Sequence, residues 1–220
     1  MIVNEGGVVL SRRAFGEHDR LCSVFTERLG KIPTRFVGVN RAKGKMKALS
    51  EPGVWGEYRL HLSARSEFAK AVGGRLTCSF PGWRAELGRT FDALACLEML
   101  DRLTPDHQPS PEKYRLICAV LAALDGSPSG WLVPSFGLRL AGMLGIGLRE
   151  RIPAPCRSIW TALHDEEPAA LAAIAFDAGA AEAARLLLDE HFAAHAGRRL
   201  RAFEFREAVM TANDVQGVPA

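Results

Sequence analysis

The sequence predicts an α+β protein of two domains, with a small five-stranded β-barrel over residues 1–80 and an all-helical domain over residues 81–220. Two observations carry this prediction. Before Ser79, short β-rich runs alternate with turn residues, and after Pro81, apolar residues recur every three or four positions. With 220 residues, of which 48% are hydrophobic and 24% charged, the chain can bury a core in each domain.

The predicted strands are short and regularly spaced. In the run "GVWGEYRLHLSA", Val54, Tyr58 and Leu60 alternate with residues of the opposite face, as in a half-buried strand. Five short strands would expose open edges unless they close, so an OB-type barrel is the first choice, and an SH3-like barrel fits the same pattern. The five runs cover residues 6–15, 20–27, 31–40, 53–64 and 68–80.

The second domain is predicted to be a bundle of helices. Ser110 is a plausible N-cap, Pro111 suits the first helical position, and Gly197 is a suitable stop for a preceding helix. Two prolines in "LRERIPAPC" indicate a linker. The predicted helices cover residues 84–103, 110–126, 133–147, 168–176, 180–197 and 198–210.

No catalytic, nucleotide-binding or metal-binding motif is complete. "GVNRAKGK" resembles a phosphate-binding loop, but five residues separate its glycines and Met46 stands where Ser or Thr would bind magnesium. His191 and His195 are four residues apart but lack a third ligand nearby. The five cysteines form no C-x-x-C pair, which is typical of reduced thiols in a cytosol. We therefore expect no enzyme activity, cofactor or metal.

The apolar stretches are too short to span a bilayer. The longest of them, "LICAVLAAL", covers only residues 116–124, and the N-terminus has no basic start followed by a long apolar run. We expect a soluble, cytoplasmic protein without a membrane partner.

Positive charge is concentrated in the first third of the chain. Residues 1–80 hold 14 Lys and Arg against 7 Asp and Glu, whereas the remaining 140 residues hold 14 against 18. A basic excess confined to one module is typical of proteins that bind polyanions.

The stretch "VNRAKGKMKA" at 39–48 carries four cations and no carboxylate. On a loop beside a barrel, such side chains can follow a phosphate backbone without reading sequence, although a merely solubilising loop remains an alternative. Nearby cations alternate with aromatic residues, of which Phe25 and Phe36 are expected in the core. The candidate nucleic-acid-binding residues are Arg13, Arg35, Arg41, Lys43, Lys45 and Lys47, with Arg198, Arg199 and Arg201 near the far end.

Several stretches, which follow one another along the chain in the family's order, together resemble the RecO family of bacterial DNA repair proteins. The hairpin "VVLSRRAFGEHDRLCSVFTERLGKI" is similar to the family's first strands, and "GVNRAKGKMKALSEPGVWGEYRL" to its basic loop and fourth strand. Further similar stretches are "SFPGWRAEL", "LEMLDRL", "FGLRLAGMLGIG" and "HFAAHAGRRLRAFEFREAV". No single motif is diagnostic, but the collinear set is fairly specific.

The resemblance implies a recombination mediator with an N-terminal OB barrel and a helical C-terminal domain. Such a protein binds single- and double-stranded DNA, anneals complementary strands, and acts with RecR to help RecA replace the single-strand binding protein SSB, whose C-terminal tail recruits many members. It also implies no catalysis and a nucleoid-associated location in the cytoplasm.

One feature departs from the family pattern. Many members carry a four-cysteine zinc module after the stretch similar to "LAGMLGIG", whereas this chain has only Cys156 between residues 148 and 160. We therefore expect the zinc to be lost. An RNA-binding OB protein, a protein-only adaptor and, third, an enzyme of unrecognised type remain as alternatives to the DNA mediator.

Overall fold

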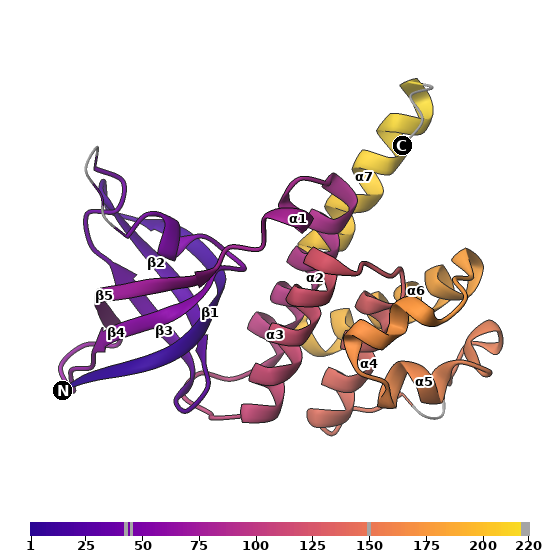
Figure 1. Cartoon of the computed structure of the whole chain (residues 1–220), viewed down its shortest axis with the longest axis horizontal. Helices are drawn as coiled ribbons and strands as arrows, with labels where there is room; N and C mark the ends of the chain where they lie inside the picture. Colours follow the sequence, from indigo (N-terminus) through magenta and orange to yellow (C-terminus); the bar gives the residue numbers. More distant parts are fainter. Residues whose placement is uncertain (42–43, 45, 149–150, 217–220) are drawn as a thin grey trace. The chain divides into compact units, whose positions relative to one another are not determined.

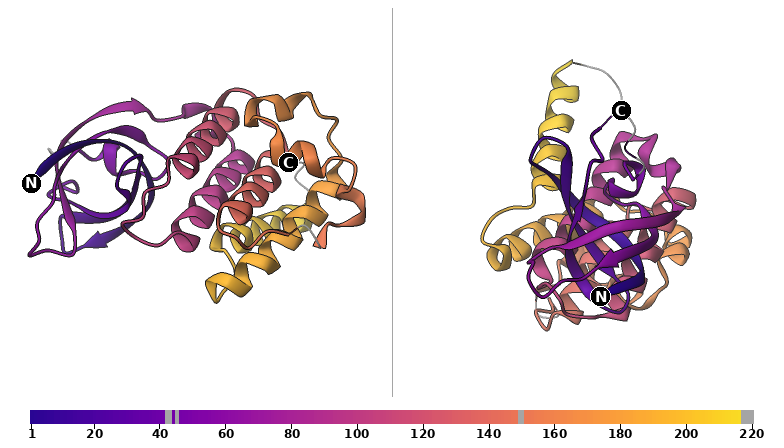
Figure 2. Two further views of the ribbon diagram at one scale, coloured as in Figure 1. Left: turned by 90° about the horizontal axis from the view of Figure 1, so that it is seen from below. Right: turned by 90° about the vertical axis from the view of Figure 1, so that its left-hand side faces the viewer.

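The computed structural model describes residues 1–41, 44, 46–148 and 151–216, and it contains a β-barrel followed by helices (Figure 1). The strands close in the order β1-β2-β3-β5-β4, and the left view of Figure 2 shows them as a ring. All neighbouring strands are antiparallel except β3 and β5, which are parallel. The predicted five-stranded OB-type barrel is confirmed. The strands are β1 (Ile2–Phe15), β2 (Asp19–Thr26), β3 (Gly30–Phe36), β4 (Trp55–His61) and β5 (Ala69–Cys78).

The long strand β1 allows the barrel to close. Its first half pairs with β4 from Ile2 to Val8, and its second half pairs with β2 from Gly7 to Phe15. The pairing register with β2 shifts between Val9 and Ser11, which is the signature of a β-bulge. A bulge bends a strand and increases its twist, so β1 can turn from one neighbour to the other.

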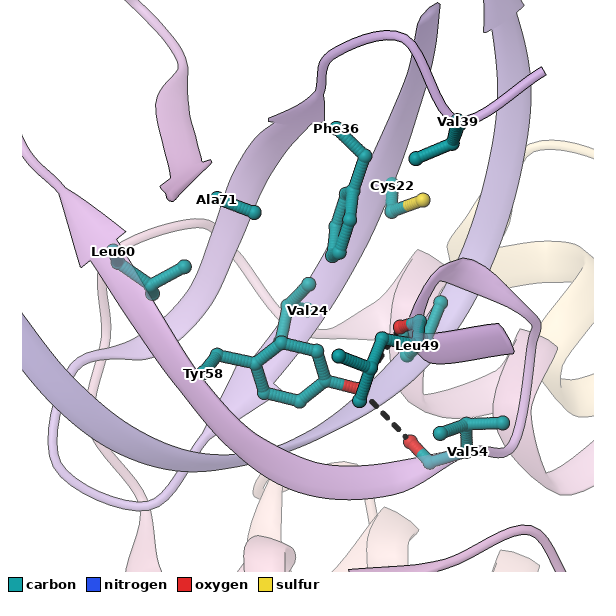
Figure 3. Packing of buried hydrophobic residues seen from close by; sticks show 10 residues of the cluster. Cys22, Val24, Phe36, Val39, Leu49, Val54, Tyr58, Leu60 and Ala71 are labelled. Atoms are coloured by element: carbon teal, nitrogen blue, oxygen red, sulfur yellow. Dashed lines mark hydrogen bonds between the residues drawn. The ribbon is translucent and has the colours of Figure 1, made fainter. Parts of the chain in front are cut away.

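The barrel interior is filled by apolar side chains that alternate along the strands (Figure 3). Phe36 and Tyr58 meet edge to face, with ring centroids 6.1 Å apart. The Tyr58 hydroxyl lies 3.1 Å from the Leu49 carbonyl oxygen and 3.3 Å from that of Val54. Phe25 and Phe36 are fully buried, so their predicted place in the core is confirmed.

Part of the helical sequence belongs with the barrel. The structure divides into two compact units, one formed by Met1–Phe80 with Leu100–Leu121 and the other by Pro81–Met99 with Ala122–Ala220. In the first unit, which we call the barrel unit, the Lys31 ammonium lies 3.7 Å from the Asp101 carboxylate and 3.2 Å from that of Asp106. The predicted domain boundary between residues 80 and 81 stays a prediction.

Gly30, at the start of β3, provides a test of this packing. Its φ is +74°, and a Cβ built on it would lie 2.1 Å from the backbone oxygen of Gln108. Gly30→Ala should therefore destabilise the barrel unit, by about 1 to 2 kcal/mol from the left-handed backbone alone. Urea unfolding measures this loss. Gly16→Ala is the control, because Gly16 also has a positive φ but has nothing within 4 Å of its Cβ position. Equal losses in the two variants would contradict the close approach of Gln108.

The remaining secondary structure is helical, in agreement with the predicted second domain. The predicted helix 84–103 corresponds to α2, which begins three residues later, at Leu87, whereas Arg84 is the last residue of the separate short helix α1. The predicted helix 168–176 forms only a short 3-10 helix. Gly197, with φ +76°, follows α6 as predicted. The α-helices are α1 (Pro81–Arg84), α2 (Leu87–Leu103), α3 (Pro111–Gly126), α4 (Leu132–Met143), α5 (Trp160–Asp165), α6 (Ala178–Ala196) and α7 (Arg201–Gln216). The 3-10 helices that the structure describes in full are η1 (Ala48–Ser50), η3 (Ala154–Cys156) and η4 (Pro168–Ala173).

Polar contacts attach α7 to its neighbours in the second unit, Pro81–Met99 with Ala122–Ala220, which we call the helical unit. Arg206 forms an ion pair with Asp92 of α2, and the Ala202 amide donates a 2.9 Å hydrogen bond to the Glu98 carboxylate. A carboxylate at the first turn satisfies an amide that has no partner within the helix, and it also interacts favourably with the helix dipole.

Candidate nucleic-acid interface

We call the segment 37–47, between β3 and η1 in the sequence, the basic arm. Arg20, almost buried at the start of β2, ties both flanks of this arm to the barrel. Its guanidinium donates to the Asn40 side chain at 3.0 Å, to the Ser50 hydroxyl at 2.9 Å and to the Glu51 carboxylate at 2.7 Å. The backbone N–H of Asn40 also donates to the His18 carbonyl oxygen at 3.0 Å. The base of the arm is therefore fixed beside the β1–β2 turn.

Asp19 organises the residues around this base. One carboxylate oxygen accepts a 2.7 Å hydrogen bond from the Gly38 amide, and the other lies 2.6 Å from the guanidinium of Arg35. The Gly38 amide contributes most to a lowered pKa of Asp19, and Arg35 and Arg41 lower it further, while burial opposes them. Because the folded pKa lies below the usual 3.8, this contribution to stability is present above pH 3.8 and is lost as pH falls through the lowered value.

Two aromatic rings lie beside this ion pair. The Arg35 guanidinium is 5.1 Å from the centroid of the Phe15 ring, within the usual range of a cation–π contact. Phe15 in turn meets Phe68 edge to face, with ring centroids 5.7 Å apart and planes at 75°. Phe15 ends β1 and Phe68 precedes β5, so the contact joins the β1–β2 and β4–β5 connections.

Three of the predicted binding residues come together at this end of the barrel. Arg13 and Arg35 are both exposed and both lie opposite Leu21, one on each neighbouring strand, so they share the outer face of the sheet. Arg41 is exposed and packs near Gly38, where a Cβ would lie 3.6 Å from the Arg41 Cδ. Lys47 is exposed at the other end of the arm, directly before η1. The predicted residues Lys43 and Lys45 lie outside the described residues.

The three arginines predicted near residue 200 belong to the helical unit. Arg199 donates to the Asp189 carboxylate at 2.6 and 2.8 Å and lies 3.1 Å from that of Glu207. Arg198 and Arg201 are exposed. Arg199 therefore pairs with two carboxylates of the helical unit. Nucleic-acid binding by the three arginines stays a prediction.

Several cations of the barrel are neutralised by carboxylates. Arg12 pairs with Glu51, Arg28 with Glu5, and Arg75 with Glu57. Within the described part of the barrel unit, by contrast, no ion pair is found for Arg13, Arg41, Lys47 or Lys70, all of which are exposed. Among the described residues, the cations without an ion pair therefore include Arg41 and Lys47 of the basic arm and Arg13 and Lys70 of the adjoining strands.

Sequence reasoning missed three residues of this surface. In the sequence Asp19 stands close to Glu17, and nothing there indicates which of the two carboxylates would contact Arg35. Phe68 lies far from Phe15 in the chain. Lys70 lies opposite Arg35 through the parallel pairing of β3 and β5, which the alternation pattern does not indicate. Only the tertiary pairing brings these residues to the same surface.

The cysteines and possible metal ligands have structural surroundings. Burial raises the pKa of Cys22 and Cys118 to about 12, so these thiols are protonated near neutral pH and are poor nucleophiles. The Cys156 thiol is buried and lies 3.1 Å from the Ala180 carbonyl oxygen. Among the residues that the structure describes, no group of three or more His, Cys, Asp or Glu could hold a metal ion. In the same part of the chain, each helix is too short or too polar to cross a bilayer.

Comparisons with known proteins agree with the two-part fold. DNA repair protein RecO of Desulfitobacterium hafniense is 28% identical over 144 residues, which cover 66% of this chain and 52% of the relative. The protein of the same name from Clostridium perfringens is 26% identical over 150 residues, covering 67% and 60%, and that of Geobacter metallireducens is 30% identical over 122 residues, covering 55% and 49%. The chain thus spans about half the length of the curated relatives it matches.

Two family models match consecutive parts of the chain. Residues 1–77, which form almost the whole barrel, match the model described as recombination protein O N terminal. Residues 84–162, from the end of α1 to the start of α5, match the model described as recombination protein O C terminal. The order of the two matches is that of the barrel and the helices, and together with the RecO relatives it shows that the chain belongs to the recombination protein O family.

Proposed function

We propose that this chain is a DNA repair and recombination mediator that binds single- and double-stranded DNA without catalysing a covalent change. The observation that carries the proposal is the exposed positive charge at one end of the barrel. Arg13 and Arg41 lie near the Asp19–Arg35 pair, and Lys47 ends the basic arm. Such a surface can contact phosphates of any sequence and release their counterions.

The mechanism that we propose is electrostatic. Two complementary strands repel each other, and cations that contact both of them reduce this repulsion so that bases can pair. Because Arg20 holds Asn40 and Asp19 holds Gly38, the neighbouring Arg41 stays beside the barrel. The strand annealing attributed to this surface requires neither nucleotide hydrolysis nor a metal ion.

Partners would supply the biological specificity. By its family, we propose that the chain acts with RecR to promote the loading of RecA onto DNA covered by SSB, that the SSB C-terminal tail recruits it, and that it works at the nucleoid in the cytoplasm. The RecO relatives are named as DNA repair proteins, which supports this assignment.

The first test measures the affinity for a labelled single strand as a function of salt. We expect the affinity to fall steeply between about 50 and 200 mM salt, and replacement of Arg41, Lys43, Lys45 and Lys47 by Ala to reduce the slope of log K against log salt by up to about 3. The replacement should also lower the affinity about tenfold or more, because four phosphate contacts are lost.

The control replaces Arg12 and Arg75 by Ala, because both are exposed on the same barrel but paired with Glu51 and Glu57. This control is compared with the double variant Arg41→Ala/Lys47→Ala, which also removes two positive charges. If the two double variants lost equal affinity, the arm would have no special role. If the wild-type protein bound no nucleic acid near physiological salt, a protein-only adaptor would be indicated, and tighter binding to matching RNA would indicate an RNA-binding factor.

The second test measures annealing of complementary oligonucleotides with and without SSB. We expect faster annealing with the protein under both conditions, and less acceleration at higher salt because counterions screen the arm. Absence of any acceleration under both conditions would overturn the mediator function.

A further inference from the structure

The pair Phe15–Phe68 lies where OB barrels have their two main ligand-binding loops. In OB folds generally, the outer face of strands 2 and 3 and the connections β1–β2 and β4–β5 bind oligonucleotides and oligosaccharides. Here Phe15 is the last residue of β1 and Phe68 directly precedes β5, so each ring comes from one of these two connections. Their contact, with ring centroids 5.7 Å apart, shows that the two connections meet.

Both rings are partly accessible to solvent although each is large and apolar. Exposed aliphatic side chains also occur next to the pairing of β3 with β5, since Val37 and Val72 are 42% and 43% exposed and directly follow the paired residues Phe36 and Ala71. An accessible aromatic pair is a surface that favours a flat, apolar ligand.

The cation beside the two rings, Arg35, has a carboxylate partner among the described residues, unlike the cation Arg41 of the basic arm. Arg35 lies over Phe15 but is held by Asp19 at 2.6 Å, and Asp19 also accepts from the Gly38 amide. Because the ion pair is neutral as a whole, Arg35 attracts a phosphate less than an unpaired cation would. It fixes Phe15 instead, and the uncompensated Arg13 and Arg41 lie close by for the phosphates.

We propose that Phe15 and Phe68 form a stacking site for the unpaired bases of a single DNA strand. This inference rests on the proposed function, since it adds base contacts to the electrostatic contacts of the arm. Bases stacked inside a duplex cannot reach the two rings, whereas those of a single strand can. The site therefore gives the protein a preference for single strands that cations alone would not provide.

The first test requires no mutation. It compares the affinity of the wild-type protein for a single strand of about 16 nucleotides with that for a deoxyribose-phosphate strand of the same length that carries no bases. Since one stacked base favours binding, we expect the natural strand to bind about fivefold more tightly or better. Salt-dependent binding of both strands with equal affinity would overturn the stacking site but leave the proposed function intact. Absence of salt-dependent binding to either strand would overturn both.

The second test assigns the preference to the two rings. Phe15→Leu/Phe68→Leu keeps apolar volume but removes both aromatic surfaces, and Phe205→Leu is the matched control because Phe205 is 62% exposed on α7 of the helical unit. We expect the double variant to lose the fivefold preference for the natural strand while its duplex affinity and salt slope stay within about twofold of the wild type. Retention of the preference, or an equal loss of duplex affinity, would overturn the assignment.

A third measurement uses the unmodified protein, so it does not depend on whether the variants fold. A single strand containing 5-iododeoxyuridine is irradiated in the complex, and the cross-linked peptides are identified by mass spectrometry. We expect cross-links at Phe15 or Phe68, because a base stacked on a ring holds the photoreactive carbon against it. Cross-links confined to other residues would overturn the site.

Discussion

Replacement of Arg20 by alanine is expected to lower the free energy of unfolding of the barrel unit by about 3 kcal/mol. The Arg20 side chain is only 9% exposed, and it donates to Asn40, Ser50 and Glu51. Its removal leaves the fully buried Ser50 hydroxyl without this donor and Glu51 without its shorter ion pair. Breaking a buried charged network is costly because the groups that remain lose their partners without regaining water.

Arg12→Ala is the matched control for this prediction. Arg12 pairs with the same Glu51 at 3.2 Å, but its side chain is 41% exposed, so its loss should cost at most about 1 kcal/mol. Urea unfolding of both variants gives the two values. Hydrogen exchange then locates the change, which for Arg20→Ala should be faster exchange at the start of β2 and around η1. Equal destabilisation by the two substitutions would contradict the structural role of Arg20.

The sequence predicted the fold well because the barrel depends on local alternation. Val54, Tyr58 and Leu60 repeat with period two in the sequence, and all three are buried in the barrel core. Gly197 has the φ of +76° that a helix-terminating glycine adopts, and this position too could be read from the sequence. Hydrophobic periodicity and helix termination depend on residues a few positions apart, so a single sequence is enough to predict the strands and the helix ends.

Features that depend on distant pairing could not be predicted in this way. The parallel pairing of β3 with β5, and the packing of Leu100–Leu121 with the barrel, join residues separated by dozens of positions. Phe68 was not selected as a functional residue because its neighbour Phe15 is 53 positions away. The short helix α5 was also missed, since six residues are too few to show a 3.6-residue period.

Candidate binding residues were the least predictable part. A charge count treats all cations alike, but the structure separates those with carboxylate partners from those without. Arg35 was predicted to bind a phosphate backbone directly, and the structure shows it paired with Asp19 and placed over Phe15. Arg41 and Lys47 are exposed as the hypothesis requires. The distinction depends on which carboxylates the fold brings near each cation.

The same distinction leads to a prediction for the helical unit, where Arg199→Ala should lower the free energy of unfolding by about 2 kcal/mol. The Asp189 side chain is only 6% exposed, and its charge is paired by Arg199. One oxygen of Asp189, Oδ1, is buried and has no hydrogen-bond partner among the described residues, so Oδ2 and Arg199 are important for keeping the carboxylate in place. We expect less than for a fully buried pair because Arg199 itself is 45% exposed and solvent screens it.

Arg198→Ala, which removes the same charge from the preceding exposed position, is the control and should change the free energy of unfolding by no more than about 0.5 kcal/mol. The double variant Arg199→Ala/Asp189→Asn should recover part of the loss, because the buried carboxylate is then replaced by a neutral group. Urea unfolding of the four proteins completes the comparison. If Arg199→Ala were as stable as Arg198→Ala but bound DNA more weakly, Arg199 would act in binding and the ion pair with Asp189 would contribute little to the fold.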